Sequence, residues 1–114
     1  MTPRRGDVVL LASPRIGFGR PTGGELALVL QVDRATQLLG TLIVAPVDSR
    51  FDPQRLLDFD VVIPAADLGG RVDHVAHVHL LRSVLVDAVQ GEPIGAAGRE
   101  AMKRALRAER LLLG

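Results

Sequence analysis

Two histidines that stand one residue apart are the side chains of this sequence best suited to chemistry. His77 and His79 lie within residues 72–89, a stretch rich in Val, Leu and His that predicts one bent strand, or two with a break near 82–83. Residues two apart on a strand point to the same face, so we expect the two imidazoles to share a groove. Because imidazole changes charge near neutral pH, one ring can serve as general base and the other as general acid.

The same histidines have two other interpretations, which the sequence leaves open. Imidazole and carboxylate are ligands that suit zinc or manganese, so Glu25 and Asp48 could complete a metal site with His77 and His79. Alternatively, both rings are half-buried, neutral and bonded to backbone carbonyls, which is the interpretation we adopt for His74, near a turn. Our expectation rests on acid–base chemistry, with no metal and no cofactor.

Four short apolar segments and a terminal helix must position these groups. Apolar runs closed by Gly or Pro predict strands, and apolar residues recurring at helical spacing predict the helix. The expected strands are 6–11, 26–32, 41–47 and 59–63, and the expected helix is 98–113. A turn at 90–93 should end the histidine-containing stretch, and 33–40 should form a turn region or one helical turn. This order predicts a small, barrel-like β sheet with a packed helix.

The composition predicts one domain that shares an interface with another subunit. The chain has 114 residues, which we expect to form a single domain (1–114), and 47% of them are hydrophobic. So small a domain has more apolar surface than it can bury alone, so we expect a subunit interface. The loop at 13–24 is too rich in Gly and Pro for regular structure, and long loops of this kind often carry function.

Several functional classes are excluded by what the sequence lacks. The absence of Cys removes disulfide frameworks, thiolate nucleophiles and cysteine-bound zinc. No apolar run approaches the length of a membrane span and no apolar signal core stands at the N-terminus, so we expect a cytoplasmic protein without membrane contact. A net charge of +1 gives no overall basic footprint, and without Trp or Tyr the usual platforms for stacking bases are nearly absent.

The C-terminal helix carries a basic stripe with two interpretations. Arg99, Lys103, Arg107 and Arg110 recur at helical spacing and could track phosphates or dock an acidic partner. Such a stripe is more often the solvated face of a surface helix, which is the interpretation we favour. No Ser, Thr, Asp or Asn stands at the start of this helix to cap it.

Several short segments match one family in order and, as far as residue 47, in nearly ungapped spacing. They are 6–7, 23, 27–30, 45–49, 59–62 and 82–84. Together they resemble the MazF/PemK (Kid) family of type II toxin–antitoxin toxins. The resemblance implies a mainly β fold with α, namely an SH3-like small β-barrel with a C-terminal helix, and a homodimer. It also implies sequence-specific cleavage of single-stranded RNA and an antitoxin protein as partner.

This chain departs from the family pattern at the positions that carry the family's chemistry. The family Arg-Pro before the second strand is Glu25-Leu26 here, and the family Thr after the third strand is Asp48, with the hydroxyl of Ser49 next to it. A Glu-Gln pair of the first loop aligns with Arg20-Pro21. The Arg and Asp that some members use on the fifth strand align with His77 and His79.

These replacements predict a rebuilt site that cleaves single-stranded RNA without metal. His77 and His79 are the expected base and acid, and the other expected catalytic residues are Asp48 and Ser49. Arg20, Glu25 and Arg82 occupy the expected substrate-binding positions, with 13–24 shaping access. The alternative is a module that has lost catalysis but still dimerises and binds an antitoxin or another partner.

Overall fold

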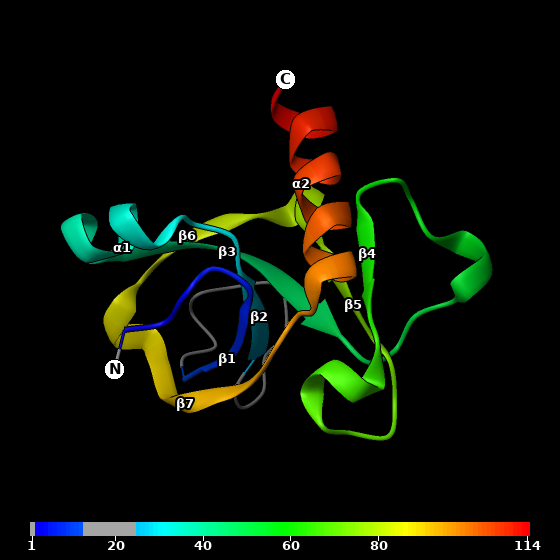
Figure 1. Ribbon diagram of the computed structural model, residues 1–114, viewed down its shortest axis with the longest axis horizontal. Coiled ribbons are helices and arrows are strands. Elements are labelled where there is room, and N and C mark those ends of the chain that lie inside the picture. The colour runs from blue at the N-terminus through cyan, green and yellow to red at the C-terminus, as the bar shows by residue number, and fades with distance from the viewer. Residues whose placement is uncertain (1, 13–24) are drawn as a thin grey trace.

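One antiparallel sheet with a long C-terminal helix forms the protein (Figure 1). The computed structural model describes residues 2–12 and 25–114, so Arg20 and the 13–24 loop lie outside the described residues. The strands are β1 (Asp7–Leu11), β2 (Glu25–Val29), β3 (Thr41–Asp48), β4 (Asp60–Ile63), β5 (His74–His77), β6 (Arg82–Leu85) and β7 (Val89–Ala96). The helices are α1 (Asp33–Leu39) and α2 (Arg99–Leu113), with 3-10 turns η2 (Pro53–Arg55), η3 (Ala65–Leu68), η4 (Val78–Leu80) and η5 (Val86–Ala88).

The long strand β3 divides the sheet because it changes partner along its length. Its first half pairs with β6 and its last two residues pair with β5, while β2 lies along its other side. Pro46 stands at the change, where it has no N–H to continue a ladder. The resulting strand order is β4-β5-β3-β2-β1-β7, with β6 attached to β3.

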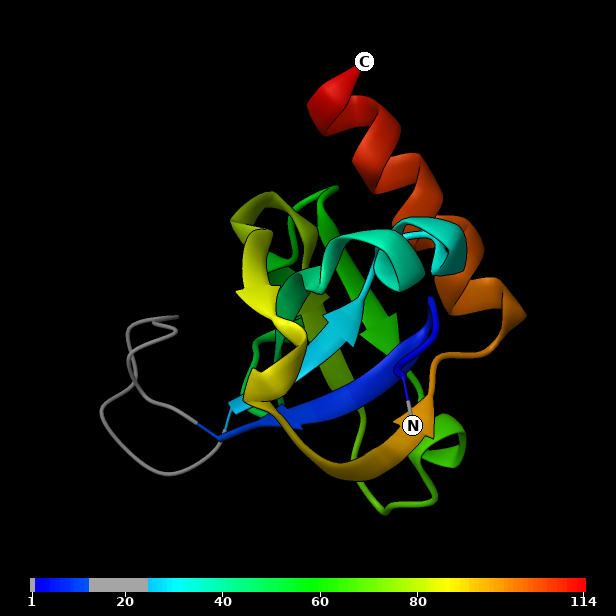
Figure 2. The same cartoon turned by 90° about the vertical axis from the view of Figure 1, so that its left-hand side faces the viewer.

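Two apolar clusters occupy the two faces of this sheet. Beneath α2, the helix places Ala101, Ala105 and Ala108 at spacings of four and three, so that all three face the sheet and are buried. These small side chains let the helix approach Val61, Ala76 and their neighbours closely. The opposite face holds a second cluster of Val9, Leu11, Ala27, Val29, Leu42, Val44 and Val84. In Figure 2 α2 runs along one side of the sheet, which leaves most of the helix surface in solvent.

The start of α2 is bonded to a distant part of the chain. Gly98 is the N-cap residue, and its N–H donates to the Asp67 carboxylate at 2.8 Å. Asp67 belongs to η3, which packs on β7 immediately before the helix. The acceptor is 31 residues away in sequence, so no local sequence pattern predicts this bond. This bond fixes where α2 begins relative to β4.

The predicted mainly β architecture with a C-terminal helix is confirmed, while several boundaries were wrong. The segment 33–40 contains a seven-residue helix, α1. The second strand ends at Val29, not at 32. Strand β7 runs through the turn expected at 90–93, because it is an edge strand with a register shift opposite Val8 and Leu10, where Pro and a positive-φ Gly91 are tolerated.

The histidine-containing stretch is also broken at a different place from the one expected. Strand β5 ends at His77, the turn η4 follows, and β6 begins at Arg82, where the sequence predicted a break. His79 therefore lies in a turn, and the expectation that both histidines share one strand was wrong. No helix in the described part of the chain is long and apolar enough to cross a membrane.

The close packing of η3 on β7 predicts that alanine substitution will destabilise the protein at one glycine and hardly affect it at another. A Cβ added at Gly95 would lie 2.9 Å from the Leu68 Cα, whereas one added at Gly70 meets nothing within 4 Å. We therefore expect Gly95→Ala to lower the free energy of unfolding by about 1–3 kcal/mol, as overpacking does, and Gly70→Ala to change it by less than about 0.5 kcal/mol. Urea denaturation of the two variants measures this difference. Equal stabilities would contradict the close approach of η3 to β7.

Candidate active site

The carboxylate of Asp60 lies at the centre of the candidate site. Asp60 begins β4 and pairs across the sheet with His77, the last residue of β5. Its side chain is only 7% exposed, and Oδ1 lies 2.7 Å from the His77 Nδ1. The same oxygen lies 3.9 Å from the His79 Nδ1, and Oδ2 accepts a bond from the Leu57 N–H at 2.8 Å. Both histidines therefore lie close to one buried carboxylate.

The turn η4 brings His79 back toward His77. Val78 is fully buried and its N–H still donates to the Phe59 carbonyl at 3.0 Å, while the Leu81 N–H donates back to the Val78 carbonyl at 3.2 Å and closes the turn η4. The imidazole of His79 then lies 6.0 Å from that of His77, centroid to centroid, with the two planes at 84°. The Phe59 ring lies 5.9 Å from the His79 ring, centroid to centroid. The two imidazoles therefore meet through a turn and not through strand alternation.

The hydrogen bonds assign different roles to the two rings. An ionised carboxylate only accepts, so the Nδ1–H of His77 donates to Asp60 and its Nε2 is left as an acceptor for a proton. The His79 Nδ1 is buried and has no hydrogen bond within the described residues, but a protonated His79 would lie beside the Asp60 charge. Both side chains keep contact with solvent, at 24% and 28% exposure. The pair can accept one proton and donate another.

Three of the other predicted residues share a face of the sheet with His77. In an antiparallel sheet, directly paired residues and residues two apart on one strand point to the same face. The strand register therefore places His77, Val75 and Asp48 on one face of the sheet. Followed along β3, it adds Arg82 and Glu25 to that face. Glu25 is 7% exposed at the start of β2, and Asp48 accepts a bond from the Arg50 N–H at 3.0 Å. The side chain of Ser49 is exposed just beyond the end of β3.

The alternative metal site receives no support from this arrangement. Within residues 2–12 and 25–114, no group of three or more His, Asp and Glu side chains is placed to hold a metal ion. His74 faces the other side of β5 from His77, and its Nδ1 lies 3.2 Å from the Val72 carbonyl, as expected for a histidine bonded to backbone.

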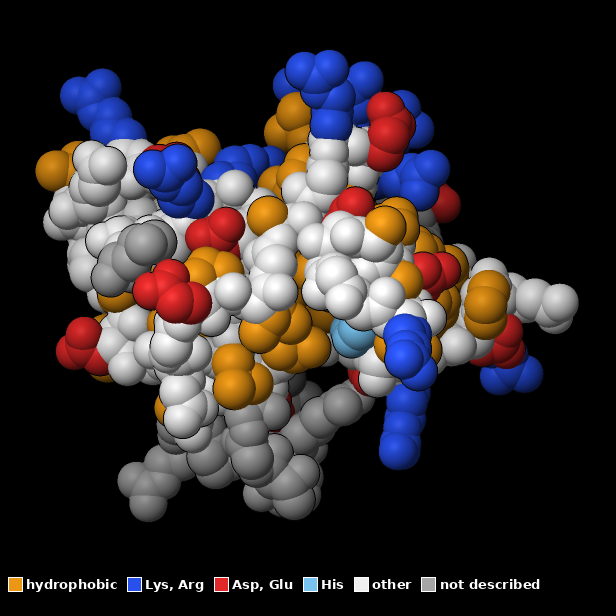
Figure 3. Space-filling model, turned by 60° about the horizontal axis from the view of Figure 1, so that its bottom comes forward, with side chains coloured by type: hydrophobic (Ala, Val, Ile, Leu, Met, Phe, Trp, Pro, Cys, Tyr) orange, Lys and Arg blue, Asp and Glu red, His pale blue; other side chains and the backbone are white. Residues whose placement is uncertain are grey.

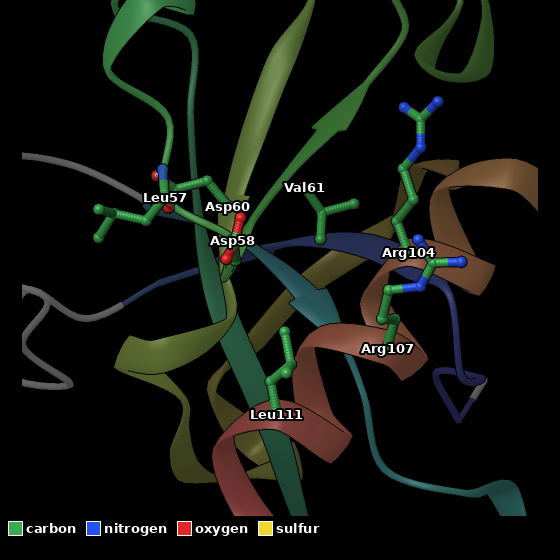
Figure 4. Close-up of a pocket in the computed structure, with 7 residues that line it drawn as sticks. All are labelled: Leu57, Asp58, Asp60, Val61, Arg104, Arg107 and Leu111. Atoms are coloured by element: carbon green, nitrogen blue, oxygen red, sulfur yellow. Dashed lines mark hydrogen bonds between the residues drawn. The ribbon is translucent and has the colours of Figure 1, made fainter.

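A hollow of about 450 Å³ lies between the start of β4 and the helix α2 (Figure 4). Its lining residues are Leu57, Asp58, Asp60, Val61, Arg104, Arg107 and Leu111. Neither this hollow nor the role of Asp60 was predicted from the sequence. Asp60 stands within the family-matching segment 59–62, but only the strand register shows that it lies opposite His77.

Comparison with known proteins identifies the family. Residues 4–113 match the family described as PemK-like, MazF-like toxin of type II toxin–antitoxin system. The chain belongs to this family. No curated protein sequence matches it.

Solved structures of toxins share its fold. A MazE–MazF complex from Deinococcus radiodurans has a TM-score of 0.78 at 24% identity, covering 100% of this chain and 97% of the other. An endoribonuclease in complex with its cognate antitoxin, from a mycobacterial species, has a TM-score of 0.77 at 15% identity, covering 98% and 95%. The Mycobacterium tuberculosis toxin MazF-mt6 has a TM-score of 0.69 at 16% identity, covering 90% of each chain. At these identities the likeness concerns the fold.

The bond between Asp60 and His77 predicts a tautomer that one substitution should reverse. Neutral His77 should carry its proton on Nδ1, because the carboxylate accepts there. In Asp60→Asn the amide oxygen can still accept the hydrogen bond from the Leu57 N–H, so the amide NH₂ faces His77. The His77 Nδ1 must then accept, and the imidazole proton should be on Nε2. Long-range ¹H–¹⁵N NMR of the imidazoles measures this, with His74 as an unchanged internal control. An Nε2–H tautomer in the wild type would contradict the assignment.

Proposed function

We propose that the protein is an endoribonuclease that cleaves single-stranded RNA in the cytoplasm without a metal ion. The observation that carries the proposal is the pair of imidazoles 6.0 Å apart beside one buried carboxylate. Membership of the toxin family and the likeness in fold to a mycobacterial endoribonuclease support the same class of reaction.

In the proposed reaction His77 is the base and His79 is the acid. The His77 Nε2 takes the proton of a ribose 2′-hydroxyl, whose oxygen attacks the adjacent phosphorus. Protonated His79 gives its proton to the departing 5′-oxygen as the phosphorus–oxygen bond breaks. The products are a 2′,3′-cyclic phosphate and a 5′-hydroxyl end, and the two histidines have exchanged protonation states. Asp60 keeps His77 oriented and stabilises the imidazolium that forms.

The remaining predicted residues have auxiliary roles in this proposal. Arg82 is exposed on the His77 face and supplies positive charge to the phosphate, as Arg20 would from the first loop. Ser49 and Asp48 lie at the end of β3, where the hydroxyl can hydrogen-bond the sugar–phosphate backbone.

We also propose a homodimer and an antitoxin as partners. Large apolar side chains are exposed around α1 and the β3–β6 pair, and these are Val32, Leu38, Leu39, Ile43 and Leu85. Burial of such side chains against a second copy is the simplest way to remove them from water. Structures of relatives in complex with cognate antitoxins support a proteinaceous partner.

The proposed acid and base predict a loss of cleavage on substitution of one histidine. Purified protein in EDTA should digest a long single-stranded RNA, and His79→Ala should be slower by about 10²–10⁴-fold, which is the usual contribution of a general acid. Gel electrophoresis of the fragments and mass spectrometry of their ends measure rate and product. His74→Ala, whose imidazole bonds to a backbone carbonyl on the other face, is the matched control and should cleave normally.

The same digestion separates this proposal from a binding module without catalysis. That second function is favoured by the acidic residues Glu25 and Asp48 on the face that would approach the phosphate. It predicts no cleavage by the wild type, together with a stable complex when the protein is mixed with an acidic antitoxin. Equal cleavage by the wild type and His79→Ala, or none by either, would remove the histidine mechanism.

A further inference from the structure

The two imidazoles of the candidate site are held in place by different means. The His77 ring is fixed by its bond to Asp60 at 2.7 Å. The His79 Nδ1 lies 3.9 Å from the same carboxylate oxygen, which is too far for a hydrogen bond, and it has no hydrogen bond elsewhere in residues 2–12 and 25–114. The χ2 torsion of a histidine has only a broad preference, so the rotamer does not fix the ring plane either. The orientation of the His79 imidazole therefore depends on packing.

The packing does not come from the helix α2. Val61 and Ala76 lie beneath α2, each in the apolar cluster that contains its alanines. Asp60 and His77 stand next to these residues along β4 and β5, so their side chains point to the other face of the sheet. His79 reaches that face, since its Nδ1 borders the Asp60 carboxylate. In Figure 3 Lys and Arg side chains gather over the region of α2, which covers the face opposite Asp60 and His77.

Phe59 contacts the turn η4 through both its backbone and its ring. Its carbonyl accepts the Val78 N–H at 3.0 Å, and its ring lies 5.9 Å from the His79 ring, centroid to centroid, with the planes at 46°. The other ring beside His79 is that of His77, at 6.0 Å and 84°. Because His77 is already fixed by Asp60, these two neighbours form a rigid border for the His79 imidazole. Phe59 is the neighbour whose ring takes no part in the hydrogen bonds of the site.

The orientation of the His79 ring decides which of its atoms can meet a substrate. Since Nδ1 is buried toward Asp60, Nε2 is the nitrogen that can carry a proton outward. If the ring turned over about χ2, Cε1 would take the place of Nε2 and Cδ2 the place of Nδ1. A C–H group would then face the departing oxygen, where the proposed reaction needs an N–H donor. A general acid at this position works only if the ring is held in one orientation.

We propose that Phe59 is the positioning residue that holds the His79 imidazole with Nδ1 toward Asp60 and Nε2 toward the departing 5′-oxygen. The inference rests on the proposed ribonuclease function and extends it by naming the residue that aligns the acid. Phe59 has no part in orienting the base, because the bond between Asp60 and His77 does that. Loss of the Phe59 ring should therefore affect protonation of the leaving group, and neither RNA binding nor attack by the 2′-hydroxyl.

NMR of the free protein tests the orientation without RNA. The variants are Phe59→Leu and, as the matched control, Phe51→Leu, which removes the same ring from a half-buried position with no ring contact to either histidine in the described chain. In the wild type and the control, Hδ2 and Hε1 of His79 should show different NOEs to the protons of Asp60 and His77. In Phe59→Leu both ring protons should show NOEs to the same neighbours, because both orientations are populated. An unchanged pattern in Phe59→Leu would overturn the inference.

Cleavage of two RNAs tests whether the ring serves the acid. In the second RNA, sulfur replaces the bridging 5′-oxygen at the mapped cleavage position. As the phosphorus–sulfur bond breaks, the thiolate departs with the electron pair and needs no proton, whereas the 2′-hydroxyl must still be deprotonated. On ordinary RNA, Phe59→Leu should lower kcat by roughly 10–10²-fold with KM nearly unchanged, as expected for a misplaced catalytic group. On the sulfur RNA, the wild type, Phe59→Leu and His79→Ala should agree within about threefold.

A double variant checks that Phe59 acts through His79. Phe59→Leu/His79→Ala should cleave ordinary RNA no more slowly than His79→Ala alone, because no acid is left to position. Phe51→Leu should cleave both RNAs as the wild type does. Equal slowing of Phe59→Leu on both RNAs, or a further loss in the double variant, would show that Phe59 only supports the fold and would overturn the inference.

The failure of the two proposals can be told apart. If the wild type cleaves neither RNA, the histidine mechanism falls, while the NOE pattern still decides whether Phe59 orients His79. If the wild type cleaves ordinary RNA and Phe59→Leu cleaves it as fast as Phe51→Leu, the mechanism stands and the role of Phe59 falls.

Discussion

A buried carboxylate is costly unless hydrogen-bond donors and positive charge surround it, and the candidate active site is arranged around one such group. Asp60, at 7% exposure, is satisfied by the Leu57 N–H on one oxygen and by the His77 Nδ1 on the other. This requirement ties together the segment before β4, the end of β5 and, at 3.9 Å, the turn η4. The geometry of the two imidazoles therefore follows from the need to compensate one charge.

The position of α2 depends on bonds to residues far away in sequence. Its first turn is held by Asp67, and its last turns by Arg5, whose guanidinium donates to the Leu30 carbonyl and lies 3.1 Å from the Glu109 carboxylate. Three buried alanines between these ends let the helix sit close to the sheet. With both ends fixed, Arg104 and Arg107 occupy a defined place beside β4. Arg5, near the N-terminus, thus helps to hold in place a surface formed by the C-terminal helix.

The strands β1, β3 and β4 were predictable from the sequence, because apolar runs closed by Gly or Pro occur where they form. The β7 strand was not, since an edge strand accommodates Pro93 and Gly91 that would interrupt an interior one. The proximity of His77 and His79 was expected for the wrong reason: the burial of Val78, and not strand alternation, turns the chain. The bonds of Asp60 to His77 and of the Gly98 N–H to Asp67 join residues 17 and 31 apart, which no local pattern contains.

The rate of RNA cleavage by Asp60→Asn is the most direct measure of whether this carboxylate organises a catalytic pair. The substitution preserves size and one hydrogen bond, so the protein should remain folded with both histidines present. We expect its kcat/KM in EDTA to fall by roughly 10²-fold or more, because His77 then presents a proton where it must accept one. Cleavage at the wild-type rate by the folded variant would contradict a catalytic pair organised by Asp60.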